Sequence, residues 1–80
     1  MVQTLSEMRA DECGAILEIY GGQGLLNRLG ALGIIPGKKI TKISSASARG
    51  PVTIQVNRSQ VALGFGMASK ILVNVDRKAG

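Results

Sequence analysis

The chain has 80 residues, a net charge of +5, no histidine and a single cysteine. One domain with a thin core fits this length, because so small a domain buries only about 60% of the surface that its unfolded chain exposes. The composition argues against a zinc site, which needs about four Cys, His or carboxylate ligands, against histidine-based catalysis, and against stacking on single-stranded nucleic acid, since only one tyrosine and one phenylalanine are present.

The whole chain, residues 1–80, is expected to form one domain with frayed ends at 1–4 and 77–80. Its uncharged run at 59–69 is much shorter than the ~20 residues that cross a bilayer. The N-terminus lacks the basic and apolar regions of a signal peptide, and a lone Cys13 agrees with a reducing compartment. We therefore expect a cytoplasmic protein, which could reach the inner face of the membrane through a partner.

Five short strands are predicted. The alternation is clearest where Val52, Ile54 and Val56 share one face. In the first strand, Leu17 and Ile19 are expected on one side. The third pattern is less regular, because Ile40 and Ile43 are three residues apart, so either a bulge lies between them or one side chain points outward. The predicted strands lie within residues 15–20, 38–44, 51–57, 61–63 and 71–75.

Glycines at positions 21, 22 and 24 open the one predicted helix and suggest a phosphate-binding loop. However, a P-loop requires Lys followed by Ser or Thr at the helix start, where this chain has Leu25 and Leu26. The dinucleotide-binding pattern requires a third glycine where this chain has Asn27. We therefore interpret these glycines as structural.

The helix is expected to place Leu25, Leu29 and Leu32 against the sheet, with Leu26 at the border of that face. Gly33 then ends the helix in the left-handed conformation of a Schellman cap.

Gly30 lies inside the helix, where it costs roughly 1 kcal/mol relative to alanine. A close approach of the helix to the sheet is the preferred reason for it. The pair Pro36 and Gly37 predicts a type II turn. Short connections between the strands favour a small barrel over an open sheet.

With these residues placed, the chain resembles the FeoA family of small cytoplasmic accessory proteins of ferrous iron transport. The most specific part is LxxRLxxLGIIPG over residues 25–37, supported by LSEM at 5–8, VAL at 61–63, MA at 67–68 and ILV at 71–73. The chain departs from the family pattern at 10–11, where Pro-Gly is common, and at 64–67, where polar or acidic residues are common.

The resemblance implies an all-β fold with one inserted helix, a small five-stranded SH3-like barrel. It also implies a partner, the membrane ferrous iron transporter FeoB, with its cytosolic GTPase domain. Our leading hypothesis is therefore a noncatalytic accessory or regulatory protein that docks on that cytosolic part. The same barrel occurs as the C-terminal domain of DtxR-type repressors, so a domain of a DNA-binding regulator is the alternative.

Candidate contacts for the partner are apolar or basic side chains. We expect Phe65 to be exposed, and slightly favour core positions for Leu26 and Ile35. Arg28 could act as an activating arginine in the partner's GTPase site, but a salt bridge within this chain, to Glu18 or Glu12, is favoured. The full set of candidates is Leu26, Arg28, Ile35, Lys38, Lys39, Phe65 and Met67.

A local cluster of Lys38, Lys39 and Lys42 could bind nucleic acid weakly and without sequence specificity, although a solvated strand edge explains it better. No specific nucleic acid is expected. Self-association into a homo-oligomer is a further expectation.

No cofactor is expected, although ferrous iron could bind weakly through oxygen and sulfur ligands. The weak candidates are Glu7, Asp11, Glu12 and Cys13. Enzymatic activity is the least supported class, because no nucleophile has a histidine base beside it.

Overall fold

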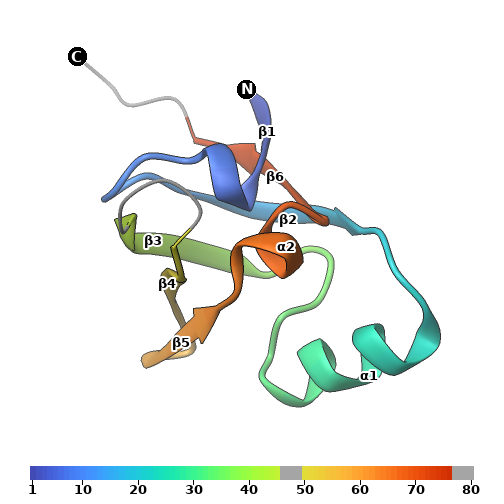
Figure 1. Ribbon diagram of the computed structural model, residues 1–80. Helices are drawn as coiled ribbons and strands as arrows, with labels where there is room; N and C mark the ends of the chain where they lie inside the picture. The colour runs from blue at the N-terminus through green and yellow to red at the C-terminus, as the bar shows by residue number, and fades with distance from the viewer. Residues whose placement is uncertain (46–49, 77–80) are drawn as a thin grey trace.

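One antiparallel sheet coils around the core in the computed structural model, which describes residues 1–45 and 50–76 (Figure 1). Within these residues the sheet has six strands in the order β1-β6-β2-β3-β4-β5. The strands are β1 (Val2–Thr4), β2 (Cys13–Ile19), β3 (Lys39–Ser45), β4 (Val52–Val56), β5 (Ser59–Leu63) and β6 (Ile71–Val75). The helices are the 3₁₀ turn η1 (Leu5–Glu7), α1 (Gln23–Ala31) and the short α2 (Phe65–Ala68).

The two ends of the sheet are not joined by hydrogen bonds. Within the described residues, β1 pairs with β6 alone and β5 pairs with β4 alone. η1 and α2 pack against each other, and their Leu5 and Ala68 belong to the core. The structure is consistent with the predicted small barrel, but among the described residues hydrogen bonds do not close the sheet, and it has six strands instead of five.

The predicted alternation holds in the two best-patterned strands. Val52, Ile54 and Val56 of β4 are buried, as are Ile71, Val73 and Val75 of β6. The residues between them on β4 are half-buried or exposed. The buried core consists of Leu5, Met8, Ile16, Ile19, Leu29, Ile34, Ile40, Val52, Ile54, Val56, Leu63, Ala68, Ile71, Val73 and Val75.

The face predicted for the first strand is wrong. Ile16, rather than Leu17, is buried together with Ile19, and Leu17 is exposed. The pairing of β2 with β6 shifts register between Ile16 and Glu18. A β-bulge there changes which residues face the core, so strict alternation fails.

The N-terminal residues, for which a frayed end is predicted, lie in a strand. Val2–Thr4 form β1, which pairs with β6 from Val2 opposite Asn74 to Thr4 opposite Leu72. The amine of Met1 donates to the carbonyl oxygen of Val75 at 3.2 Å. This end of the chain is held by pairing with a strand that is distant in sequence, and local sequence patterns do not predict such pairing. The frayed end predicted at 77–80 lies outside the described residues.

The end of α1 has the predicted Schellman cap. Gly33 has a φ of +85°. The backbone N–H of Ile34 donates to the carbonyl oxygen of Leu29 at 2.9 Å, and the N–H of Gly33 donates to the carbonyl oxygen of Gly30 at 3.0 Å. The type II turn is also confirmed, because Gly37 has a φ of +90° and Lys38 N–H bonds the carbonyl of Ile35 at 3.1 Å.

The leucine face of α1 is only partly covered. Leu29 is fully buried, Leu25 and Leu26 are half-buried, and Leu32 is 43% exposed. The close approach predicted at Gly30 is absent: a Cβ there would meet only Ile35 Cγ2, at an ordinary 3.8 Å. α1 extends from one end of the sheet instead of lying flat on it (Figure 1).

Candidate docking surface

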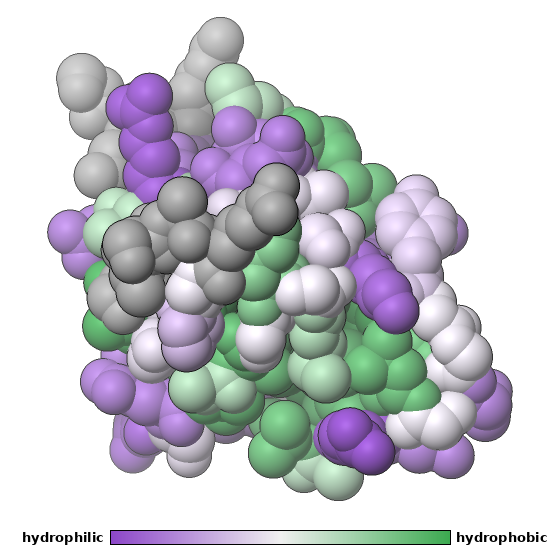
Figure 2. Space-filling model, in the orientation of Figure 1, coloured by the Kyte–Doolittle hydropathy of each residue, from purple (hydrophilic) through white to green (hydrophobic). Residues whose placement is uncertain are grey.

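Exposed apolar side chains gather on α1 and the turn after it. Leu32 is 43% exposed and Ile35 is 49% exposed, beside the half-buried Leu25 and Leu26. We call these four residues, with Arg28, the α1 surface. Apolar surface is visible over α1 and the segment that follows it (Figure 2). Exposed apolar side chains grouped on one surface are candidates for an interaction site.

The structure corrects the expected position of Ile35. Core burial was favoured for it, but it opens the type II turn and half of its side chain faces solvent. Leu26 is intermediate, packed partly against the core. The neighbouring Ile34 fills the core position instead, because the Schellman cap turns it back toward Leu29.

The salt bridge predicted for Arg28 is absent. Its guanidinium is on an exposed residue and makes no ion pair with Glu18 or Glu12 in the part of the chain that the structure describes. Glu12 instead accepts a hydrogen bond from the backbone N–H of Arg9 at 2.6 Å. Arg28 is therefore available to a partner as a donor.

A second apolar region lies on α2. Phe65 is exposed, as expected from its position between two glycines, whereas Met67 is half-buried against the core. The side chain of Tyr20 is 52% exposed, and its backbone N–H bonds the carbonyl of Lys70 at 2.8 Å. Tyr20 was not among the predicted contacts, because its place beside the α2–β6 connection depends on strand pairing.

The three lysines of the predicted basic cluster do not form one solvated edge. Lys38 is half-buried and Lys39 is exposed, but Lys42 is only 1% exposed. The register of β3 and β4 shifts between Lys42 and Ser44, so of the two possibilities for the Ile40–Ile43 spacing a bulge is present, and it lies at Ile43. Lys42 lies two residues after the buried Ile40 and before this shift, so ordinary alternation places both on the inward face of β3. Lys42 is therefore not part of a solvated basic cluster.

The ammonium of Lys42 is enclosed by backbone carbonyls. It donates to Leu5 O at 3.0 Å and to Ser6 O at 3.2 Å, and it also bonds Met8 O. Burial lowers the pKa of Lys42, while the nearby charge of Glu12 opposes this shift. Three carbonyls match the three N–H donors of the group, so Lys42 has a structural role.

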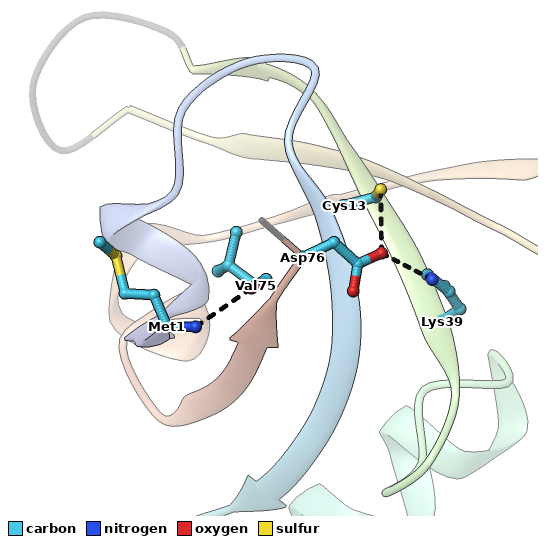
Figure 3. Close-up of polar contacts among 5 residues, drawn as sticks. All are labelled: Met1, Cys13, Lys39, Val75 and Asp76. Carbon is cyan, nitrogen blue, oxygen red and sulfur yellow. Dashed lines mark hydrogen bonds and ion pairs between the residues drawn. The ribbon is translucent and has the colours of Figure 1, made fainter. Parts of the chain in front are cut away.

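Lys39 forms an ion pair with Asp76, which follows β6 (Figure 3). Its Nζ lies 2.6 Å from Oδ2 of Asp76, which also accepts a hydrogen bond from Cys13 Sγ at 3.4 Å. The hydrogen bonds from Lys39 and then Cys13 lower the pKa of Asp76, and the same contact raises the pKa of Lys39. Asp76 was not predicted, because sequence distance hides this contact.

The acidic and sulfur candidates for iron do not converge. Glu7 Oε1 accepts from the N–H and the hydroxyl of Thr4, each at 3.0 Å, and these bonds lower the pKa of Glu7. Within residues 1–45 and 50–76, no three Cys, Asp or Glu side chains are grouped so that they could hold a metal ion. Asp11, Glu12 and Cys13 are therefore neighbours in sequence without forming a ligand set with Glu7.

Comparisons with known proteins agree on the fold. The sequence matches the FeoA domain family over residues 3–75. The crystal structure of an iron uptake regulatory protein, FeoA, superimposes with a TM-score of 0.87 at 33% identity, covering 94% of this chain and 99% of that one. The NMR structure of a FeoA-like protein from Clostridium acetobutylicum gives 0.84 at 19% identity, covering 99% and 92%. The expected all-β, SH3-like fold with an inserted helix is confirmed.

A longer protein also contains this fold. T. acidophilum IdeR superimposes with a TM-score of 0.81 at 26% identity, covering 94% of this chain and 34% of that one. This chain therefore spans about a third of IdeR. No significant match is found among curated proteins. In the described residues, no helix combines the length and the apolar character needed to span a membrane.

Proposed function

Because this chain belongs to the FeoA domain family, whose members are ferrous iron transport accessories, we propose that it docks on the cytosolic GTPase region of the FeoB transporter. In this proposal it is a noncatalytic cytoplasmic protein that supports or regulates uptake. The observation that carries the proposal is the α1 surface, where Leu32 and Ile35 are 43% and 49% exposed.

The geometry of α1 supports docking through this surface. Leu29 anchors the helix in the core, while the side chains around it stay accessible. The Schellman cap and the type II turn hold Ile35 in a defined position beside Gly30 of α1. A preorganised apolar surface binds with little ordering cost, which favours a specific protein contact.

The positive charge of this chain favours a partner that has acidic residues at the edge of its contact surface. The chain carries a net charge of +5, and the exposed Arg28 of α1 adds a guanidinium four residues before Leu32, without an ion pair in the described residues. Complementary charge speeds association and fixes orientation more than it raises affinity. We assign Arg28 to this contact; an additional effect on phosphoryl transfer would appear as a change in the partner's GTPase rate.

Binding to the purified cytosolic domain of the transporter tests the proposal, measured with GDP and with a nonhydrolysable GTP analogue. Ile35→Glu and Leu32→Glu should each weaken binding by about tenfold or more, because each removes apolar contact and introduces a charge. Val2→Glu is the matched control, since Val2 is 55% exposed on the edge strand β1, outside the α1 surface. It should bind like the wild type.

Two outcomes would reject this proposal. One is the absence of binding in both nucleotide states; the other is equal loss of binding in the control and the α1 variants. Arg28→Ala compared with the wild type in a GTPase assay separates a contact role from a catalytic one. An unchanged rate with weakened binding supports the contact role.

The alternatives have less support from the arrangement of side chains. Lys42 is buried and Lys39 is paired with Asp76, so the predicted basic cluster offers little to nucleic acid. A gel shift at low salt would restore that alternative. Anaerobic calorimetry with ferrous iron tests the metal alternative in the same preparation.

A further inference from the structure

The outer edge of β5 is open to another strand. Within the described part of the chain, β5 has β4 as its one strand neighbour. Its five residues, Ser59–Leu63, include no charge and no proline, and its pairing with β4 has no register shift. Edge strands are usually protected by such features or by being very short, as β1 is with three residues. β5 has none of these protections.

The hairpin turn determines which backbone groups face outward. Asn57 and Arg58 form a two-residue turn with φ values of +51° and +67°, and Val56 lies opposite Ser59. In such a turn the flanking pair exchanges both hydrogen bonds. The bonding then alternates along the strand, so Gln60 and Ala62 direct their N–H and C=O groups away from β4.

We propose that this edge pairs with the β5 strand of a second copy of the chain, antiparallel and about a two-fold axis at Val61. In this register Gln60 lies opposite Ala62 of the second copy, and Ala62 lies opposite its Gln60. Both pairs have outward-facing groups on both strands, so all four N–H groups and all four C=O groups can be used. A register centred on Gln60 or Ala62 leaves part of these groups unpaired.

Side chains and charges fit the same register. Gln60 and Ala62 are both exposed, and a long side chain beside a small one packs without a clash across the strands. Arg58, the charged residue nearest the edge, would lie opposite Gly64, so no like charges meet. The six-stranded sheets of the two copies would then form one continuous sheet across the two-fold axis, and the same surface of each copy would make the contact.

The overall charge predicts how salt affects this dimer. Each copy carries a net charge of +5, while the proposed contact contains no charged side chain. Long-range repulsion therefore opposes association, and salt reduces that repulsion. Raising NaCl from about 0.05 M to about 0.5 M should strengthen the dimer, whereas an interface built on ion pairs would weaken.

A pair of double variants tests the register. Gln60→Lys with Ala62→Lys places two lysines opposite each other at both cross-strand sites and should raise the dimer dissociation constant about tenfold or more. Gln60→Glu with Ala62→Lys instead places opposite charges there and should dimerise at least as well as the wild type. All four positions across the two copies are exposed in the monomer, so the fold should tolerate both variants, as circular dichroism can verify.

The readouts are sedimentation equilibrium up to about 1 mM chain and amide hydrogen exchange. Dimerisation should slow exchange at Gln60 and Ala62, the two outward amides, as concentration rises. The inference is overturned if the wild type stays monomeric throughout, or if both double variants behave alike. It is also overturned if a dimer forms without protecting these two amides.

Discussion

Lys42 donates a hydrogen bond from its ammonium to the carbonyl oxygen of Leu5 at 3.0 Å, in the interior of the protein. The same group bonds the carbonyls of Ser6 and Met8. The carbonyl of Leu5 also accepts from the backbone N–H of Met8 at 3.3 Å, but carbonyls at the end of a helical turn generally need a partner from outside the turn. Lys42 supplies it from β3, and thereby joins the segment after β1 to the centre of the sheet.

Replacing Lys42 with methionine should destabilise the protein by about 2–4 kcal/mol, because the carbonyls of Ser6 and Met8 lose this donor and the carbonyl of Leu5 keeps only the N–H of Met8. Urea unfolding followed by circular dichroism measures this change. Lys39→Met is the matched control, since Lys39 is exposed and solvent screens its ion pair with Asp76, so its loss should have little effect. Equal effects of the two substitutions would contradict the structural role of Lys42.

Alanine substitutions at two glycines should have opposite effects. At Gly14 a Cβ would lie 2.8 Å from Val75 Cα and even closer to the carbonyl oxygen of Asn74, so Gly14→Ala should destabilise by about 2 kcal/mol or more. At Gly30 a Cβ would have only an ordinary contact with Ile35. Gly30→Ala should stabilise by about 0.5–1 kcal/mol through helix propensity. Thermal unfolding of both variants checks the signs.

Glycine at position 58 should stabilise the β4–β5 hairpin. Arg58 has a φ of +67° at the second turn position, where glycine is preferred. Relief of the left-handed conformation should add about 0.5–1 kcal/mol to the free energy of unfolding. Arg58→Lys keeps the conformational cost and the charge, so it should unfold like the wild type. If Arg58→Gly instead lowers the free energy of unfolding, the arginine side chain itself stabilises the turn.

Stability should fall with acidification through two carboxyl groups. The pKa of Glu7 is lowered by hydrogen bonds from Thr4, and that of Asp76 by the bond from Lys39. Each carboxyl binds its proton more tightly in the unfolded chain than in the folded one. Their contribution is therefore complete above the ordinary values of 4.5 and 3.8 and is lost as the pH falls through the folded-state pKa values.

The double variant Glu7→Gln with Asp76→Asn tests this pH dependence, because neither new side chain titrates. Its free energy of unfolding should lie below that of the wild type at pH 7, and the difference should shrink as the pH is lowered through this range. Urea unfolding at a series of pH values measures the difference. A gap that stays constant with pH would assign the acid sensitivity to other carboxyl groups.

Local chemistry along the sequence was sufficient for much of the fold. The alternation from Val52 to Val56 predicted a half-buried strand, and Gly33 and Gly37 predicted the cap and the turn that follow α1. These features depend on neighbouring residues and on backbone conformations that glycine adopts most easily. The leucine and glycine spacing of 25–37 also carried the family resemblance.

The tertiary structure alone decided which residues the bulges and distant pairings bring together. A bulge in β2 buried Ile16 in place of Leu17, and the inward face of β3 carried Lys42 into the core. Pairing of β2 with β6 placed Cys13 beside Asp76 across 63 positions of sequence. Such contacts depend on the register between strands that are far apart in sequence, and short-range periodicity carries no information about that register. The sequence therefore determined most of the elements, while the packed sheet determined which charged groups are buried and which surfaces are exposed.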